Sequence, residues 1–161
     1  MAVKDVQKDP ANRALVVTAE FDAPVEKVWQ LWADPRKLER WWGPPSFPAT
    51  FVKHEFVAGG KVSYFMTSPE GERHYGYWDV ISVDAPQSVS LHDGFANDDS
   101  GAANDAMPAC DMNVTLSDRE GGGTVMVMRT VYPTVEAMEQ MLAMGMEEGL
   151  TLAMGQMDAL L

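Results

Sequence analysis

The sequence predicts an α+β fold in which a meandering antiparallel sheet packs against one long C-terminal helix. From Pro48 to Tyr132, apolar residues recur at every second position in six short segments, as expected for half-buried strands. Most of these segments are separated by glycine-, proline- and aspartate-containing turns of hairpin length, which favours antiparallel pairing. Residues 134–161 instead have helical spacing, and only this helix is long enough to cover one face of the sheet.

The 161 residues suffice for one domain with a sizeable core. We predict that residues 1–13, which are polar and include Pro10, form a loose lead-in, and that residues 14–161 form the domain. The segment ALVVTAEF, residues 14–21, is rich in strand-favouring residues and is predicted to be the first strand. No internal repeat is evident.

Two short helices are predicted after this first strand. Asp22 can cap the first helix, and Pro24 suits its first turn. Asp34 and Pro35 repeat this pattern at the start of the second helix, which the sequence Gly43-Pro44-Pro45 ends.

Six further strands bring the predicted sheet to six or seven strands. They are ATFVKHEFV, KVSYFMTS, RHYGYWDVISV, SVSLHDGF, CDMNVTLSD and TVMVMRTVY. The longest connection, residues 97–108, is expected to be a lid, a binding loop or a disordered segment.

The final helix, which Thr134 can cap, is predicted to run about 25 residues, or roughly 38 Å. On a helical wheel, Gly145, Gly149 and Ala153 lie along the middle of its apolar face, with methionine and leucine residues on both flanks. Small residues permit close packing on a neighbour, and they also leave space for a ligand beneath the helix. Apolar stripes are most often plain core, and the residues alone favour that interpretation.

Three strands add methionine to a face that could look toward this helix. Met66, Met112, Met126 and Met128 each share a strand face with other apolar residues. Methionine fills irregular gaps and adapts to different shapes, so such a lining also suits an apolar ligand cavity.

Charge and composition exclude several kinds of partner. Twelve basic and twenty-four acidic side chains give a net charge of −12, which repels phosphate backbones, so we expect no nucleic-acid partner. No window approaches 18 uninterrupted apolar residues and the first residues contain no signal-peptide core, so we expect no membrane insertion and a cytoplasmic location. Cys110 is the only cysteine, which excludes an intrachain disulfide and a CxxC metal site.

The segment FDAPVEKVWQLWADPRKLERWWGP, residues 21–44, resembles the opening of the SRPBCC (START-like) superfamily. Within it, the chain is similar to the family of homologues of the heat-shock-protein-90 ATPase activator. Further shared features are the pair Gly59-Gly60, the DGF motif at 93–95 and the GMEEG motif at 145–149. The resemblance covers about residues 14–161, and the chain departs from the family pattern at Val57 and Leu150.

This resemblance implies a helix-grip fold, in which a curved antiparallel sheet wraps around the C-terminal helix and leaves a hydrophobic cavity between them. The GMEEG helix then becomes one wall of a ligand site, and loop 97–108 and the WWGP segment are expected to gate it. The expected ligand-binding residues are Trp32, Trp41, Tyr64, Met66, Met112, Met126, Met128, Met146, Gly149, Leu150 and Met154.

No catalytic arrangement is evident in the sequence. The three histidines, at positions 54, 74 and 92, lie on different predicted strands without metal-ligand spacing, and no nucleophile or phosphate-loop motif occurs. We therefore expect no catalytic residues, no metal and no cofactor. If the protein were an enzyme, a polar pair would have to converge in the cavity, with His54, Tyr64, His74 and Asp93 as the candidates.

The leading hypothesis is therefore a non-catalytic binding protein for a small apolar or amphipathic molecule. One alternative is an enzyme of the cyclase or hydratase type acting on a polyketide-like or other cyclic apolar substrate. A second alternative, which follows from the family's name, is a co-regulator of the heat-shock-protein-90 ATPase. Both a monomer and a homodimer are compatible with the sequence.

Overall fold

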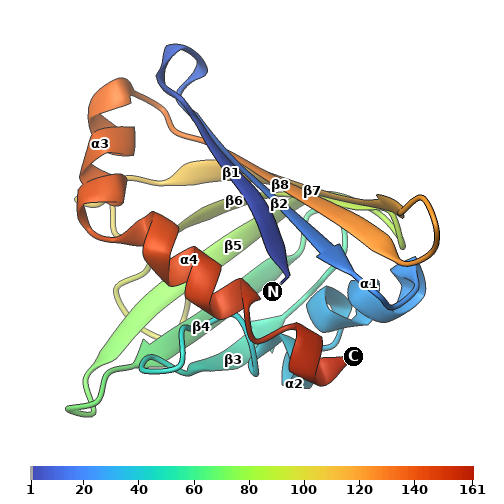
Figure 1. Ribbon diagram of the computed structural model, residues 1–161. Helices are drawn as coiled ribbons and strands as arrows, with labels where there is room; N and C mark the ends of the chain where they lie inside the picture. Colours follow the sequence, from blue (N-terminus) through green and yellow to red (C-terminus); the bar gives the residue numbers. More distant parts are fainter. Residues whose placement is uncertain (1) are drawn as a thin grey trace.

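One sheet of eight antiparallel strands, in the order β1-β2-β8-β7-β6-β5-β4-β3, forms the body of the protein (Figure 1). The computed structural model describes residues 2–161. The strands are β1 (Val3–Asp9), β2 (Ala14–Phe21), β3 (Ala49–His54), β4 (Lys61–Thr67), β5 (Arg73–Asp84), β6 (Ser88–Phe95), β7 (Cys110–Asp118) and β8 (Thr124–Val131). All seven strands predicted from the sequence are present, and the predicted α+β class is confirmed.

The eighth strand is β1, which lies in the segment predicted to be a loose lead-in. Its backbone pairs with β2 from Asp5↔Thr18 to Asp9↔Ala14, so residues 3–9 belong to the sheet. The sequence pattern failed here because β1 is an edge strand that pairs on one side only and carries Lys4, Lys8 and other polar residues. Charged side chains are common on edge strands, where they discourage pairing with other molecules.

The helices α1 (Val25–Ala33) and α2 (Pro35–Leu38) follow β2, as predicted. Asp34 caps α2, since its side chain accepts a hydrogen bond of 2.9 Å from the Arg36 backbone N–H. Asp22 does not cap α1; its carboxylate accepts a 2.7 Å bond from Arg119 instead.

The C-terminal helix is broken into two, which corrects the prediction of one continuous helix. Helix α3 covers Val135–Ala143, α4 covers Met146–Met154, and a short 3₁₀ turn at Asp158–Leu160 ends the chain. Gly145 causes the break, because it adopts a φ of +87°, in the left-handed region that other residues rarely enter. Thr134 caps α3 as predicted, accepting a bond from the Ala137 N–H.

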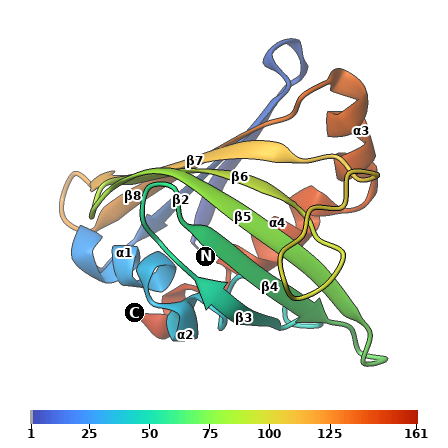
Figure 2. The same ribbon diagram turned by 180° about the vertical axis from the view of Figure 1, so that it is seen from behind.

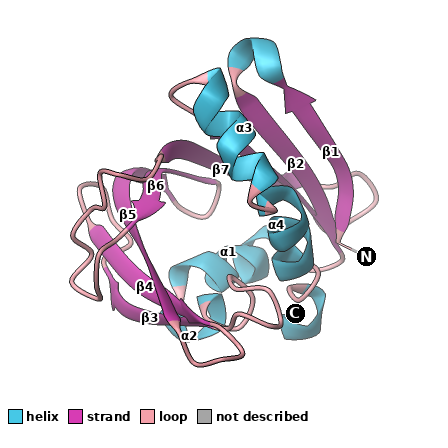
Figure 3. Ribbon diagram, turned by 90° about the vertical axis from the view of Figure 1, so that its left-hand side faces the viewer, coloured by secondary structure: helices cyan, strands magenta, loops and turns pink. Residues whose placement is uncertain are grey.

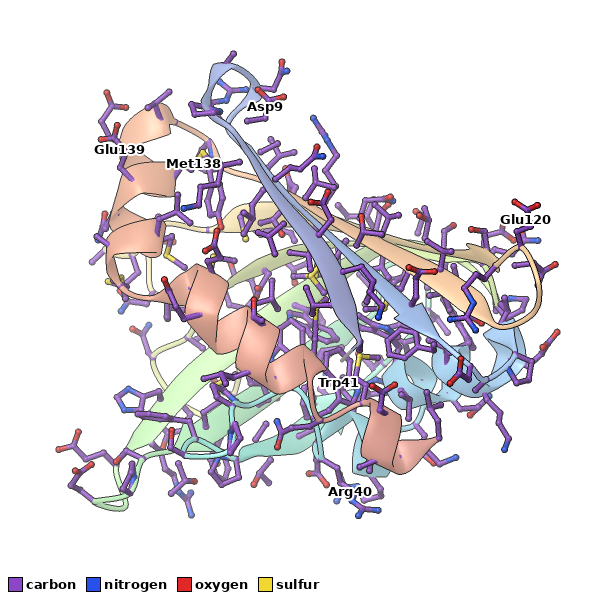
Figure 4. The ribbon with its side chains drawn as sticks, viewed as in Figure 1. Asp9, Arg40, Trp41, Glu120, Met138 and Glu139 are labelled. Carbon is purple, nitrogen blue, oxygen red and sulfur yellow. The ribbon has the colours of Figure 1, made fainter. Side chains whose placement is uncertain are left out.

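The sheet curves, and its concave face looks toward α1 and α4 (Figure 3). Helix α3 has one face toward the sheet and one away from it. Met138 points toward the sheet and is buried, whereas Glu139 points away (Figure 4). None of the helices formed by residues 2–161 is long and apolar enough to cross a membrane.

A cluster of aromatic side chains fills one end of the concave face. Ring centroids are 4.8 Å apart for Trp32 and Trp41, 4.9 Å for Trp42 and Trp78, and 5.9 Å for Trp32 and Trp42. Edge-to-face contacts at these separations stabilise beyond the burial of area alone. We refer to these four tryptophans, together with Phe51, as the aromatic cluster.

Most of the loop at residues 97–108 lies against the outer face of the sheet, over β4 and β5 (Figure 2). A bridge between Ala96 and Ala103 closes it, and Gly101 packs close to the Ser63 side chain, which points away from the concave face. Hydrogen bonds within the loop and packing against the outer face of the sheet hold this loop in place.

Candidate ligand-binding pocket

A pocket of about 410 Å³ lies between the concave face of the sheet and the two C-terminal helices; we call it the α4 pocket. Strands β4 to β7 and the segments beside them contribute Tyr64, Met66, His74, Tyr75, Gly76, Asp93, Gly94, Phe95, Pro108, Ala109, Cys110 and Met112. The remaining lining residues are Trp42, Pro44, Phe47, Tyr132, Met141, Met144, Gly145, Met146, Gly149 and Leu150.

The structure places six of the eleven expected ligand-binding residues in this lining. They are Tyr64, Met66, Met112, Met146, Gly149 and Leu150. The other five are fully buried elsewhere, with 0% of their surface exposed: Trp32, Trp41, Met126, Met128 and Met154. The two tryptophans belong to the aromatic cluster, Met126 and Met128 lie on β8 between β2 and β7, and Met154 lies in the C-terminal half of α4.

The α4 helix therefore has two different halves. Its N-terminal half, with Met146, Gly149 and Leu150, borders the pocket, whereas Ala153 and Met154 are buried in the core. A bond of 2.7 Å from the Gln156 side-chain amide to the Gly43 carbonyl fixes the end of this helix to the WWGP segment.

Gly149 leaves open space at the pocket wall. A Cβ built on Gly149 would have the Pro44 side chain as its nearest neighbour, at 3.9 Å, which is ordinary van der Waals distance. Gly149 is thus not required for close packing against the sheet. Of the three small residues along the apolar face of the helix, only Gly149 leaves space for a ligand. Gly145 forms the helix break, and Ala153 lies in the core.

A second glycine, Gly76 on β5, shapes the floor of the pocket. Tyr64 on β4 is paired with Gly76, and a Cβ on Gly76 would lie 2.4 Å from the Tyr64 ring. The tyrosine ring therefore crosses β5 directly above this glycine. Because adjacent strands are about 4.8 Å apart, the ring can reach over β5 to β6. Its hydroxyl group lies 3.4 Å from Oδ1 of Asp93 on β6 and donates a long hydrogen bond to it.

Asp93 is an acid in a largely apolar site. It shares a strand face with Val89 and Leu91, which are fully buried, and keeps part of its own surface accessible because it lines the pocket. None of the ion pairs among residues 2–161 includes Asp93. Burial raises the pKa of Asp93 from 3.8 to about 7, and the Tyr64 hydrogen bond only partly offsets this effect.

Two buried indoles border the Tyr64–Asp93 pair. The Trp42 N–H lies near enough to Tyr64, and the Trp78 N–H near enough to Asp93, to favour the charged form of each. Neither N–H completes a hydrogen bond, and both are without a partner. Burial and the Asp93 charge nevertheless raise the pKa of the Tyr64 hydroxyl well above its ordinary value.

The three histidines are not assembled into a site. His54 lies outside the pocket lining, 3.1 Å from the Trp32 carbonyl oxygen, and burial lowers its pKa. His74 lines the exposed rim of the pocket, beside Phe47. His92 is on the outer face, 2.9 Å from the Asp111 carboxylate. Of the four candidates for a convergent polar pair, the structure thus brings together Tyr64 and Asp93.

Several lining residues were not expected from the sequence. Trp42 forms the border between the aromatic cluster and the pocket, whereas its neighbour Trp41 donates its N–H to the Leu31 carbonyl inside the core. Tyr132 lies just after β8 and its hydroxyl donates to the Met146 sulfur. Asp93, an acid on the apolar side of an alternating strand, was expected only as a candidate for the polar pair and not as a ligand-binding residue.

No group of three or more His, Cys, Asp or Glu side chains within residues 2–161 is arranged to hold a metal ion. The thiol of Cys110, which borders the pocket, is buried, and this burial raises its pKa. The lining therefore offers a large apolar surface with one polar pair, rather than a metal centre or an activated thiol.

Comparison with known proteins gives a consistent assignment. The model of the family described as Activator of Hsp90 ATPase homolog 1-like protein matches residues 22–161. The crystal structure of protein Ms6760 from Mycobacterium smegmatis is 46% identical, covers 99% of this chain and 96% of that chain, and has a TM-score of 0.90. A protein from Arthrobacter aurescens, solved by NMR, is 44% identical over 97% of this chain and 90% of its own, with a TM-score of 0.91.

A more distant likeness concerns the fold alone. DynU16, a protein in the dynemicin biosynthetic locus, is 18% identical and has a TM-score of 0.61, covering 88% of this chain and 45% of its own. Among curated proteins, none matches this chain.

Proposed function

The chain belongs to the family of Activator of Hsp90 ATPase homolog 1-like proteins, and we propose that its α4 pocket binds a small apolar or amphipathic molecule. The observation that carries this proposal is the pocket itself, because its volume of about 410 Å³ lies in the range of small-molecule sites. Its lining is mostly methionine, aromatic and glycine residues, with few polar groups, which is the composition expected of such sites.

Four methionines support a binding role over a purely structural one. Met66, Met141, Met144 and Met146 line the pocket, and all four keep part of their surface accessible. Unbranched thioether side chains can repack around ligands of different shape at low cost. An apolar wall that keeps accessible surface in this way favours the uptake of an apolar molecule.

A variant that fills the pocket tests this proposal. Replacing Gly149 by leucine points a bulky side chain into the open space beside Pro44. The uncharged dye N-phenyl-1-naphthylamine, which brightens in apolar surroundings, should bind wild type and bind Gly149→Leu at least about tenfold more weakly, a difference of about 1.4 kcal/mol.

Gly155→Leu is the matched control, because Gly155 is exposed at the end of the same helix and does not line the pocket. It should bind the dye as wild type does. A Gly149→Leu variant that folds normally and binds the dye as tightly as wild type would contradict the proposal.

One specific observation favours a second candidate, an enzyme that moves protons on a cyclic apolar substrate. The Tyr64–Asp93 pair borders the pocket, and a carboxyl whose pKa is about 7 can both donate and accept a proton near neutral pH. The test is solvent-deuterium exchange at the acidic C–H positions of 2-tetralone, a cyclic apolar ketone. Wild type should accelerate exchange and Asp93→Leu should not; equal rates in the two proteins would remove this candidate.

A further inference from the structure

The α4 pocket has one carboxyl group among its lining residues within the described chain, and none of the ion pairs of residues 2–161 includes it. The carboxyl belongs to Asp93, and the Tyr64 hydroxyl at 3.4 Å is its only hydrogen-bond partner among residues 2–161. This bond is long, so it compensates little of the cost of burying a negative charge.

Three titratable groups beside Asp93, those of Tyr64 on β4, Cys110 on β7 and Tyr132 after β8, are neutral near pH 7, because burial raises the pKa of each. His74 on β5 lines the exposed rim of the same pocket, and Tyr77 on β5 lies on the outer face with Ser63. His92 is next to Asp93 in the chain but pairs with Asp111 on the outer face. Below about pH 7 the favoured state of the Asp93 side chain is therefore the neutral acid, which burial promotes.

The part of the pocket around Asp93 and Tyr64, which we call the Asp93 corner, contains a hydrogen-bond donor without a partner. A neutral carboxyl has one O–H to donate, and no hydrogen bond donated by Asp93 is formed to the residues 2–161. The Trp42 and Trp78 N–H groups beside the pair are also without an acceptor. Tyr64 uses its own hydrogen on Asp93. Both indole N–H groups are fully buried, so the O–H of neutral Asp93 is the free donor that a molecule in the pocket can reach.

From this free donor in an otherwise apolar lining we infer that the α4 pocket selects uncharged apolar molecules that carry a ketone or similar carbonyl oxygen, which accepts a hydrogen bond from Asp93 held in place by Tyr64. The inference rests on the proposed function and specifies its ligand class. The apolar body of the molecule would lie against the methionines of α3, α4 and β4, and its oxygen would point toward β6.

The position of Tyr64 gives this corner a fixed geometry. The tyrosine ring is clamped between Gly76 below and the aromatic cluster beside it, where it stacks on Phe51 at a centroid distance of 4.9 Å. Its hydroxyl can therefore hold one oxygen of Asp93 while the other oxygen remains free for the ligand. Tyr64 is in this account a positioning residue, and Asp93 makes the contact.

An amine would be the alternative partner of a carboxyl group, and the surroundings argue against it. An ammonium ion needs a charged Asp93 and would itself be buried in a largely apolar lining. A carbonyl oxygen instead needs the neutral acid and accepts its O–H.

Two ligands of the same shape test the inference: 2-acetylnaphthalene, which is a ketone, and 2-isopropenylnaphthalene, in which a CH₂ group replaces the oxygen. Affinities are measured by displacement of N-phenyl-1-naphthylamine at pH 6, and the readout is the ratio of the two. One added hydrogen bond predicts that wild type prefers the ketone by about five- to tenfold.

Three variants and one pH change then assign the preference. Asp93→Leu should lower the ratio to about one, and Tyr64→Phe should lower it in part. Asp93→Asn, whose amide also donates a hydrogen bond, should keep the ratio. At pH 9 the ratio should fall in wild type, because the acid is then charged, and stay constant in Asp93→Asn.

The outcomes separate the inference from the proposed function. If wild type binds both naphthalenes equally, the carbonyl preference is wrong while the binding function stands. If neither ligand binds, both fail. Tighter binding of 2-naphthylmethylamine than of the ketone at pH 8 would also overturn the inference, since it would show that Asp93 acts as a charged partner.

Discussion

The two ends of the concave sheet face are filled in opposite ways. At one end, the aromatic cluster packs its rings in contact, and Trp32, Trp41 and Trp78 are fully buried. At the other end, glycines and methionines surround the α4 pocket. Trp42 belongs to the aromatic cluster and also lines the pocket, and Tyr64 lines the pocket and contacts the cluster.

The difference teaches how one sheet can hold both a rigid core and a binding site. Large rings in mutual contact leave no room and fix the positions of the side chains beside them. At the pocket, Gly149 leaves open space in the wall, and Gly76 lets the Tyr64 ring cross β5 to reach Asp93. The aromatic cluster thereby holds Trp42 and Tyr64 in place as one wall of the α4 pocket.

The largest expected effect on the free energy of unfolding comes from a substitution in the aromatic cluster. Trp32→Ala should lower the free energy of unfolding by about 3–5 kcal/mol, because it removes a fully buried ring and leaves a cavity. Leu150→Ala, at the pocket wall, should cost roughly 1 kcal/mol or less, because Leu150 is already partly accessible. Urea unfolding measures both, and similar losses in the two variants would contradict the contrast between the regions.

The next effect concerns the pH dependence of stability. The pKa of Asp93 is about 7 in the folded protein, above its ordinary value of 3.8, so the native state binds more protons than the unfolded state between these two pH values. This group therefore contributes a loss of stability as pH rises from about 4 to 7, of up to roughly 4 kcal/mol at about 1.4 kcal/mol per pKa unit.

The measurement is the difference in unfolding free energy between wild type and Asp93→Asn at pH 5 and pH 8. Asp93→Asn should gain relative to wild type at the higher pH. Taking the difference cancels His54, whose lowered pKa affects both proteins equally. A difference that does not change with pH would show that Asp93 is not buried as described.

A smaller effect is expected from a methyl group on the pocket floor. Gly76→Ala places a Cβ 2.4 Å from the Tyr64 ring, so the ring must move, at a cost of about 1–3 kcal/mol. The double variant Gly76→Ala/Tyr64→Val should recover part of this loss, because the smaller side chain removes the clash. Full additivity of the two substitutions in thermal unfolding would argue against the contact.

The smallest effect has the opposite sign. Gly149→Ala adds a Cβ at ordinary contact distance from Pro44, within a helix where alanine is favoured over glycine by about 1 kcal/mol. We expect a stabilisation of up to that size in urea unfolding. A destabilisation would mean that α4 packs more tightly against its surroundings at Gly149 than the open space implies.

Much of the fold followed from local patterns in the sequence. Seven strands, the two short helices and the cap at Thr134 each depend on residues close together in the chain. The polar strand β1 was missed, because its pairing with β2 and not its own pattern makes it a strand. The helix break at Gly145 was missed because a helical wheel assumes an unbroken helix.

The pocket was harder to predict than the fold. Methionine spacing correctly placed Met66, Met112 and Met146 near one another, but it could not separate them from Met126 and Met128, which have the same pattern. The separation depends on strand order, which puts β8 beside β2 and away from β4. The Tyr64–Asp93 pair likewise depends on register across two strands and on the glycine between them.

The methionine methyl groups allow the most direct test of the central claim, that the α4 pocket binds a small apolar molecule. Protein labelled with ¹³C at its methionine methyls is titrated with 2-acetylnaphthalene and observed by NMR. The methyl signals of the pocket residues Met66, Met112, Met141, Met144 and Met146 should shift, and those of the core residues Met126, Met128, Met154 and Met157 should not. Shifts spread equally over both groups, or no shifts at saturating ligand, would contradict the account.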